Sequence, residues 1–178
     1  MEIAKLHIGC GDVILPGFIN IDILESPGVD VVADIRDLPY DHNSIELIYS
    51  CANLDHLSRH DWKEAMRHWY DILKPGGLLR LSVGDFEAIC KQYMQNKNID
   101  ELIGLTLGGQ KDRYDWHGMM FDYDYLKGHL QDIGFDNVAR YNWEDSYMGI
   151  DDFSRAYLPH MDFDNGRLMV LNMEAHKP

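Results

Sequence analysis

The order of apolar and polar residues predicts a row of short buried strands in the first fifty residues. Four apolar runs each end in glycine, an acidic residue or serine, and they cover residues 5–11, 18–22, 31–35 and 45–50. Near-continuous apolar runs of this length are typical of parallel strands that are covered on both faces. Because open α/β sheets bind ligands at the carboxyl ends of their strands, these polar ends predict a ligand crevice.

Beyond residue 60 the pattern predicts a helix and then a fifth strand. The helix has apolar residues at spacings of three and four, namely Trp62, Ala65, Met66, Trp69, Ile72 and Leu73. Asp61 is its expected cap, with Glu64 in the position of a capping box. The prolyl and glycyl residues at 74–77 should end it. The following strand is expected over residues 78–83.

Two more helices and two late strands complete the predicted elements. Asp85 should cap a helix with one apolar face, formed by Phe86, Ile89, Cys90, Tyr93 and Met94. A helix over 123–133 should end at Gly134. The late strands, 137–141 and 167–174, have no clear helix between them and could form an antiparallel edge hairpin. This alternation predicts a single α/β domain over 1–178, with a Rossmann-like, doubly wound, mostly parallel seven-stranded sheet.

The connection between the first two strands is too short for an ordinary crossover helix. Only residues 12–17 separate them, whereas such crossovers need about a dozen residues or more. A shortened first helix is therefore expected. The first strand begins near the start of the sequence, so no N-terminal lid is expected, and residues 96–123 and 143–165 are the candidate lid or substrate loops. A homodimer would be another way to close an open crevice.

Charge and composition exclude several classes of partner. The net charge is −14, with 16 basic residues against 30 acidic ones and no basic run, which disfavours a long nucleic-acid substrate. The sequence has no apolar run near 18 residues, so we expect no membrane span. Three widely spaced cysteines indicate neither a disulfide framework nor a zinc cluster, and a reducing cytoplasm is the simplest location.

Three strand ends carry the candidate chemistry. Gly9 and Gly11 follow the first strand, where the lack of a Cβ lets the backbone approach a ligand closely. Asp22 ends the second strand and could accept hydrogen bonds from ribose hydroxyls. Asp34 ends the third and could accept one from an adenine amino group. Taken singly, each is equally typical of a turn. The full GxGxxG fingerprint is absent, which argues against a nicotinamide-dependent enzyme.

These motifs, in this order, resemble the class I S-adenosylmethionine-dependent methyltransferases. The resemblance is close over about residues 5–85, and 121–140 and 166–177 are also similar. Within the class the sequence resembles a small group often associated with bacterial cell-surface saccharide clusters. The resemblance implies S-adenosylmethionine as cofactor, S-adenosylhomocysteine as product, and a set of cofactor-binding positions: His7, Gly9, Cys10, Gly11, Asp22, Ile23, Asp34, Ile35, Ser50, Cys51 and Asn53. Position 7 departs from the group, where an acidic residue or asparagine is commoner.

The acceptor side of the site is harder to predict. His117 and His56 are the candidate general bases, with Asp85 and Tyr114 near the acceptor, because they follow strands or lie in the candidate lid. No metal site is expected, since His56 and His60 lack an evident third ligand. We expect methyl transfer to a small polar molecule, such as a sugar or glycan precursor. The alternative is a non-catalytic module that binds the cofactor or a partner without turnover.

Overall fold

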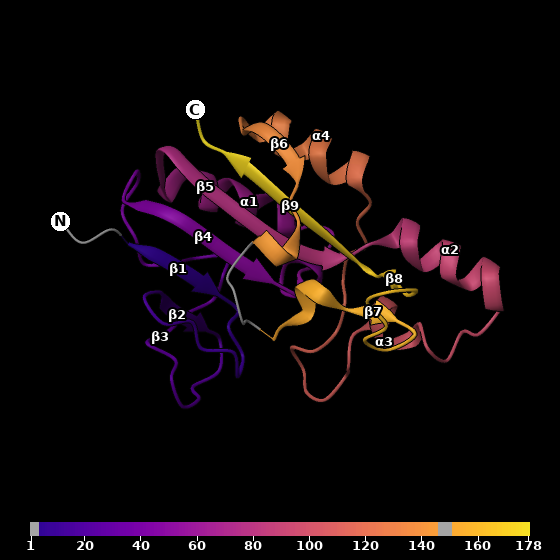
Figure 1. Ribbon diagram of the computed structural model, residues 1–178. Coiled ribbons are helices and arrows are strands. Elements are labelled where there is room, and N and C mark those ends of the chain that lie inside the picture. The colour runs from indigo at the N-terminus through magenta and orange to yellow at the C-terminus, as the bar shows by residue number, and fades with distance from the viewer. Residues whose placement is uncertain (1–3, 146–150) are drawn as a thin grey trace.

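A computed structural model describes residues 4–145 and 151–178 of the chain. Within these residues seven strands form the main sheet, in the order β3-β2-β1-β4-β5-β9-β6 (Figure 1). Their bounds are β1 (Lys5–Ile8), β2 (Ile19–Asp22), β3 (Val31–Val32), β4 (Ile45–Cys51), β5 (Leu73–Gly84), β6 (Asp136–Arg140) and β9 (Val170–His176). The order reverses between β1 and β4, which places the switch point of the sheet beside the end of β1.

The strand directions confirm the predicted sheet. Strands β1 to β5 pair in parallel, whereas β9 lies antiparallel between β5 and β6 at one edge. Ile8, the last residue of β1, is level with Ile21 on β2 and with Ser50 on β4. The carboxyl ends of these neighbouring strands therefore meet at one edge, as expected. Turns occupy residues 9–18, which confirms the shortened first helix.

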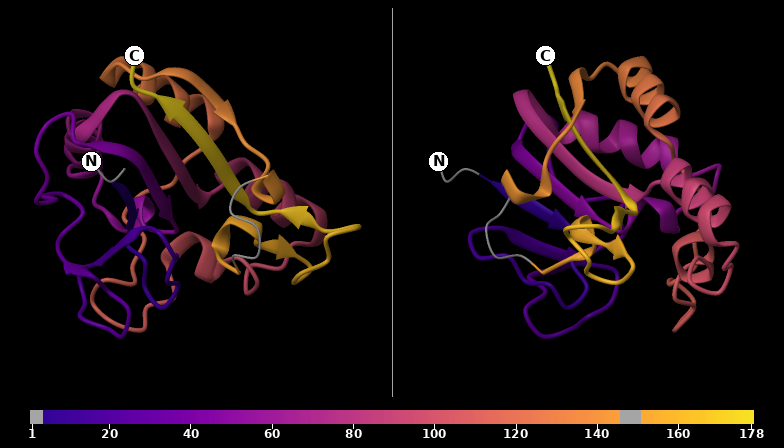
Figure 2. Two further views of the ribbon diagram at one scale, coloured as in Figure 1. Left: turned by 60° about the vertical axis from the view of Figure 1, so that its left-hand side comes forward. Right: turned by 45° about the vertical axis from the view of Figure 1, so that its right-hand side comes forward.

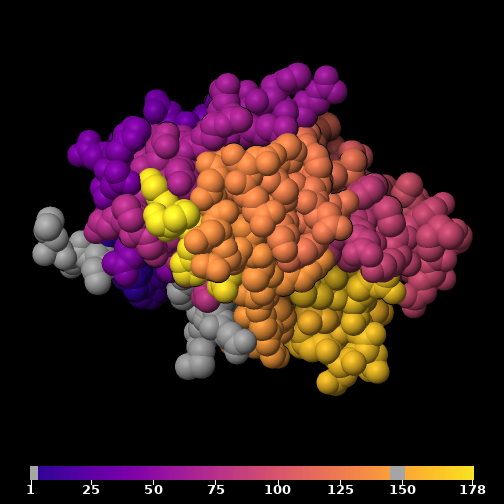
Figure 3. All heavy atoms as spheres, turned by 90° about the horizontal axis from the view of Figure 1, so that it is seen from above, coloured from indigo at the N-terminus to yellow at the C-terminus, as the bar shows by residue number. Residues whose placement is uncertain are grey.

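The helical elements lie mainly to one side of the sheet and beyond its end (Figure 2). The α-helices are α1 (Trp62–Ile72), α2 (Phe86–Asn96), α3 (Ile103–Leu107) and α4 (Tyr123–Ile133). Short 3-10 helices are η1 (Leu54–His56), η2 (Trp143–Asp145) and η3 (Phe153–Arg155). A small hairpin pairs β7 (Tyr157–Leu158) with β8 (Arg167–Leu168). Figure 3 shows α4 and the neighbouring β6 at the centre of one face, beside α2.

The main core lies between the sheet and α1. The predicted stripe of α1 is buried, and the ring of Trp62 stacks edge-on against Phe121, which precedes α4. The opposite face of β4 carries Tyr49 and Cys51, which pack with Leu15 from the turn after β1. Both faces of β4 are therefore covered, which explains its nearly uninterrupted apolar sequence.

Two local predictions are wrong. Asp61 makes no capping hydrogen bond and already has helical backbone angles; the hydroxyl of Ser58 instead accepts from the amide of Asp61. The apolar face predicted for α2 is mostly exposed, with Met94 67% accessible; Ile89 is the one member of that face that is buried, and Ala88 is buried beside it. The reason is that α2 extends past the end of the sheet, so the sheet does not cover it (Figure 1).

Among the described residues, none of the helices is long and apolar enough to cross a membrane.

Candidate active site

A cavity of about 510 Å³ opens at the carboxyl ends of β1 and β2, next to the start of α1. Its wall combines the strand ends with the turn before α1 and with a segment of the loop after α3. The lining residues are Gly9, Gly11, Asp22, Ile23, Leu24, Asp34, Ile35, Arg36, Ala52, Asn53, His56, Leu57, Ser58, Asp61, Asp112, Arg113, Tyr114, Asp115 and Trp116. The crevice predicted from the strand ends is thus present, and part of the candidate loop 96–123 lies along it.

The glycine turn after β1 packs directly against the side chain of Asn53. Gly9 has a φ of +63°, and a Cβ placed on it would lie 1.9 Å from the side-chain nitrogen of Asn53. Gly11 also has a positive φ, of +51°, but a Cβ there would meet no atom within 4 Å. Gly9 is therefore required for space as well as for backbone conformation, whereas Gly11 is required for conformation alone.

Asp22 holds the glycine turn against the end of β2. One carboxylate oxygen accepts a 2.8 Å hydrogen bond from the amide of Gly11, and the other accepts a 2.9 Å bond from the amide of Leu24. The carboxylate therefore stands at the cavity wall with its orientation fixed by two backbone donors. Because each carboxylate oxygen can accept more than one hydrogen bond, both retain lone pairs for the hydroxyls of a ligand.

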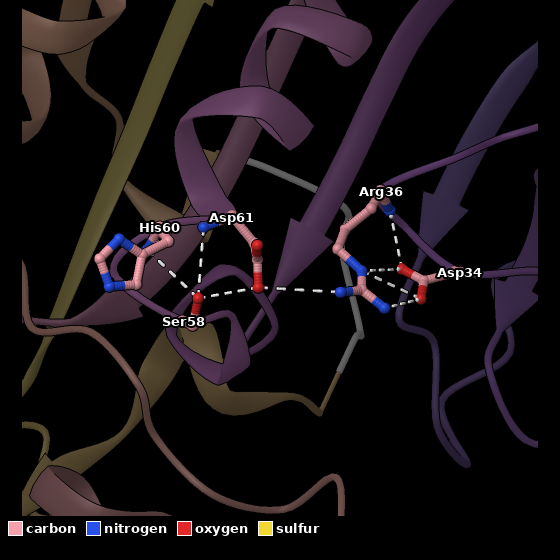
Figure 4. A network of polar contacts seen from close by, with 5 residues as sticks. All are labelled: Asp34, Arg36, Ser58, His60 and Asp61. Atoms are coloured by element: carbon pink, nitrogen blue, oxygen red, sulfur yellow. Dashed lines mark hydrogen bonds and ion pairs between the residues drawn. The ribbon is translucent and has the colours of Figure 1, made fainter.

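Asp34 and Arg36 form an ion pair that reaches the start of α1 (Figure 4). The guanidinium of Arg36 donates to Asp34 at 2.6 Å and lies 3.7 Å from the carboxylate of Asp61. Asp61 in turn accepts from the hydroxyl of Ser58 at 2.8 Å. The hydrogen bonds from Arg36 lower the pKa of Asp34 below its ordinary value. The adjoining Ile35 is fixed by its carbonyl, which accepts a 2.7 Å bond from the indole of the buried Trp69.

Four of the predicted cofactor positions lie behind the wall rather than along it. His7 is 2% exposed, its ring lies 3.2 Å from the side-chain oxygen of Asn20, and burial lowers its pKa. Cys10, Ser50 and Cys51 are also buried. Burial raises the pKa of Cys10 to about 11 and raises that of Cys51, so both remain thiols at neutral pH.

The two predicted acceptor-side residues are separated in space. Tyr114 lines the cavity beside Arg113, whose guanidinium bonds its hydroxyl at 2.5 Å. Asp85 caps α2 by accepting from the amides of Glu87 and Ala88 and is not among the lining residues. No described residue of the candidate loop 143–165 lines the cavity, and residues 146–150 of that loop lie outside the described part of the chain.

The two predicted catalytic histidines are brought together, along with an aspartate. The rings of His56 and His117 meet edge to face with centroids 4.8 Å apart. The Nε2 atom of His117 lies 3.8 Å from a carboxylate oxygen of Asp55, which is 2% exposed. Only His56 of the three lines the cavity; His117 and Asp55 stand directly behind it. Sequence reasoning paired His56 with His60 and missed Asp55.

Several cavity residues were missed for reasons that the sequence partly explains. Ser58 and Asp61 have the spacing of a capping box, and in the structure the hydroxyl of Ser58 donates to the carboxylate of Asp61 and accepts from its amide. Arg36 lies two residues after Asp34, which is the spacing of a local side-chain pair. Gly118 is a further signal: a Cβ there would lie 2.4 Å from the carbonyl oxygen of Leu57, so the loop after α3 packs tightly on η1.

The charge on the wall selects among ligands. Five aspartates and two arginines occur among the described lining residues. A cavity with this excess of carboxylates attracts a cationic ligand and repels one that carries a pyrophosphate. The cavity therefore suits a nucleoside with a positively charged substituent better than a dinucleotide.

Part of this chain is similar to a known domain family and to curated proteins. Residues 13–81 match the family described as "Methyltransferase domain". The ubiquinone/menaquinone biosynthesis C-methyltransferase UbiE of Klebsiella pneumoniae is 32% identical over 120 residues, which are 63% of this chain and 47% of that protein. The UbiE protein of Escherichia coli K12 is 31% identical over 120 residues, again 63% of this chain and 47% of that protein. The chain thus spans about half the length of the curated relatives it matches.

Solved structures show the same fold. A Thermotoga maritima protein described as a possible histamine N-methyltransferase aligns with a TM-score of 0.61 at 16% identity, covering 100% of this chain and 84% of that one. A Listeria monocytogenes protein described as an S-adenosylmethionine-dependent methyltransferase aligns with a TM-score of 0.60 at 18% identity, covering 99% and 92%.

Both comparisons therefore point to methyltransferases: residues 13–81 match a methyltransferase domain, and the fold is that of solved proteins described as S-adenosylmethionine-dependent methyltransferases. The residues present fit that cofactor. Gly9 leaves space for the side chain of Asn53, whose buried amide nitrogen has no hydrogen-bond partner among the described residues and could donate to a carboxylate. Asp22 could accept from ribose hydroxyls, and the acidic wall suits a sulfonium cation.

Proposed function

We propose that this chain transfers a methyl group from S-adenosylmethionine to a small polar acceptor. One observation carries the proposal: the cavity at the ends of β1 and β2 joins a glycine turn and Asp22 to an acidic wall. The turn and Asp22 suit the amino-acid and ribose parts of the cofactor, and the wall suits its positive charge. The cofactor supplies an electrophilic methyl group, so the remaining work of the protein is to position the acceptor and exclude water.

The acceptor is proposed to lie between η1 and residues 112–116. Tyr114 and Trp116 bring aromatic faces to this part of the wall, and Asp112 and Asp115 bring carboxylates. Aromatic faces with convergent hydrogen-bonding groups suit a ligand that has both hydroxyls and C–H faces. A sugar or glycan precursor has that character, and it is the acceptor class we favour. Asp85 is not retained in this proposal, because it caps α2 away from the cavity.

His56 is the proposed proton acceptor, with His117 positioned behind it. An oxygen or nitrogen acceptor loses a proton as its bond to the methyl carbon forms, and a positioned base typically contributes 10²–10⁴-fold in rate, roughly. His56 lines the cavity, and the ring of His117 contacts it edge to face. The amides of Gly118 and Met119 donate to the carbonyl of Asp55, at 2.8 Å and 3.2 Å, which fixes the segment that carries His117.

Calorimetric titration is the first test of the cofactor. S-adenosylmethionine and S-adenosylhomocysteine should each bind with one molecule per chain, and NAD should not bind. Binding of NAD alone, or of none of the three, would contradict the proposed site.

Formation of S-adenosylhomocysteine in the presence of a panel of sugars and oligosaccharides tests turnover. The His56→Ala variant should lose about 100-fold or more in kcat, whereas His60→Ala, which changes an exposed histidine four residues away, should not. Cofactor binding without turnover on any acceptor would favour the non-catalytic module. Unchanged turnover in both His56→Ala and His117→Ala would refute the assignment of the base.

A further inference from the structure

We propose that Asp55, His56 and His117 bind a divalent transition-metal ion of the zinc type beside the acceptor end of the cavity. Each residue offers one ligand atom, and these three atoms lie within 4.8 Å of one another. Two imidazoles and one carboxylate are a ligand set that zinc uses in catalytic sites, where a fourth position is left open. The inference deepens the proposed function, because it assigns how the two histidines act on the acceptor.

The buried carboxylate of Asp55 is the first argument. One of its oxygens has no hydrogen-bond partner among the described residues, and the other is 3.4 Å from the amide of Gly84. A carboxylate that is 2% exposed and has so few donors is costly unless a cation offsets its charge. Among the described ion pairs its only partner is His117, at 3.8 Å.

The hydrogen bond of His117 is the second argument. Its Nδ1 atom lies 3.2 Å from the carbonyl oxygen of Leu105, so this nitrogen carries the proton and donates. In the neutral ring the Nε2 lone pair then points toward the carboxylate of Asp55, an unfavourable arrangement without a cation between them. Metal-bound histidines typically donate their second ring nitrogen to a carbonyl in this way.

The side chain of His56 is the third argument. Its Nδ1 atom is buried and has no hydrogen-bond partner among the described residues. His56 nevertheless belongs to the cluster of possible ligands with Asp55 and His117. A protonated His117 paired with Asp55 would satisfy one carboxylate oxygen, but it would leave this nitrogen and the other carboxylate oxygen unsatisfied. A metal ion held by the cluster would offset the charge of Asp55 and bind a ring nitrogen of His56.

The spacing requires a small contraction when the ion binds. Ligand atoms at zinc distances of 2.0–2.2 Å lie roughly 3.3 Å apart in a tetrahedral site. The atoms here are separated by up to 4.8 Å, so rotations of the two imidazole side chains must close the site. The backbone is already fixed, since Gly118 packs on η1 and donates to the carbonyl of Asp55 at 2.8 Å.

His56 faces the cavity, so the open coordination position is expected to do so as well. An acceptor hydroxyl bound there would become more acidic. Its oxygen would form the new bond to the methyl carbon, the electron pair of the breaking carbon–sulfur bond would stay on sulfur, and the hydroxyl proton would pass to solvent. In the metal-bound protein His56 would thus activate the acceptor as a ligand of the ion, instead of accepting the proton itself.

The test is calorimetric titration of the metal-free full chain with Zn²⁺ alone, supported by the visible absorption of added Co²⁺. We expect one ion per chain for the wild type. His117→Gln should weaken Zn²⁺ binding by about 100-fold or more, since even outer partners of metal ligands are worth 10–100-fold. His60→Gln is the matched control and should bind like the wild type. Because Asp55→Asn alters a buried group and could impair folding, circular dichroism and His56→Gln provide the second check.

The result that overturns the proposal is absence of stoichiometric Zn²⁺ binding, or binding that His117→Gln and His56→Gln leave unchanged. S-adenosylmethionine titration of the same samples keeps this failure separate from failure of the proposed function. Cofactor binding without metal binding would refute the metal site alone. Metal binding without cofactor binding would support the metal site and contradict the proposed methyl transfer.

Discussion

Gly9 and Asn53 lie face to face across the end of β1, so close that a Cβ on Gly9 would be 1.9 Å from the amide nitrogen of Asn53. The contact joins the first glycine of the turn to the residue just before η1. It explains why the turn after β1 needs glycine at this position for reasons beyond backbone conformation. It also places a buried amide donor directly beside the proposed cofactor site.

Gly9→Ala is expected to destabilise the protein more than Gly11→Ala. Both changes put a side chain on a left-handed backbone, but only the first creates a clash. We expect a loss of about 2–5 kcal/mol in the free energy of unfolding for Gly9→Ala, and about 1–2 kcal/mol for Gly11→Ala. Urea denaturation measures both. Adding Asn53→Ala to Gly9→Ala should recover part of the loss, and equal losses in the two single variants would contradict the clash.

Asp22→Asn is expected to weaken S-adenosylmethionine binding by about 10–100-fold, the range of one or two hydrogen bonds to a charged group. The amide keeps one acceptor oxygen, so it can hold either Gly11 or Leu24 but loses the carboxylate geometry that holds both. Calorimetry with Asp12→Asn as control measures the effect, because Asp12 is exposed in the same turn. If the two variants bind equally well, Asp22 does not contact the cofactor.

Trp69→Phe is expected to loosen the wall of the cavity around Ile35, where we propose that adenine binds. The indole donates a 2.7 Å hydrogen bond to the carbonyl of Ile35, and phenylalanine leaves that buried acceptor and some volume unfilled. The free energy of unfolding should fall by about 2–4 kcal/mol, and cofactor affinity should fall with it. Thermal denaturation with and without S-adenosylhomocysteine measures both. Trp116→Phe, at a side chain that is 54% exposed, should leave the stability unchanged.

His7 is expected to make stability fall as the pH is lowered below its unfolded-state pKa of about 6.5. Burial lowers the pKa of His7 in the folded protein, and the nearby Asp152 and Asp22 only partly offset this. As the pH falls, His7 is therefore protonated in the unfolded state before it is protonated in the folded state. The stability that the neutral, buried ring provides is fully present above about pH 6.5 and is lost as the pH falls through the pKa of His7 in the folded protein. Melting temperatures between pH 8 and pH 5 should show a shallower decline for His7→Asn than for the wild type. An equal decline in both would refute the effect.

Much of the fold could be predicted because its signals are local. A strand that is buried on both faces leaves a short apolar run in the sequence, and its end is marked by the next polar residue. For this reason the sequence predicts the four early strands, with Asp22 at the end of β2, and the structure has them; β3 is shorter than predicted and ends at Val32, two residues before Asp34. The late strand β6 lacks this signal, because Val138 is the one buried residue of its five; the absence of a predicted helix between the late strands indicated the antiparallel edge.

The wrong predictions concern residues whose burial or role depends on which distant segment packs against them. The apolar spacing of α2 is that of a buried helix, yet Tyr93 and Met94 are exposed because the sheet ends before reaching them. Asp85 has the features of an acceptor contact and of a helix cap, and its position made it the cap. Residue spacing along the chain does not distinguish these alternatives, because the burial of a side chain depends on which other segment packs against it.

The sequence by itself determined the succession of the early strands along the chain, the glycine turn that follows the first of them and the carboxylates near the strand ends. Only the tertiary structure decided that Arg36 reaches Asp61 and that His117 meets Asp55 and His56 across about sixty residues. Such contacts depend on where a loop returns to the sheet. That path is set by close packing, here of Gly118 on the carbonyl of Leu57, and not by any periodicity in the sequence.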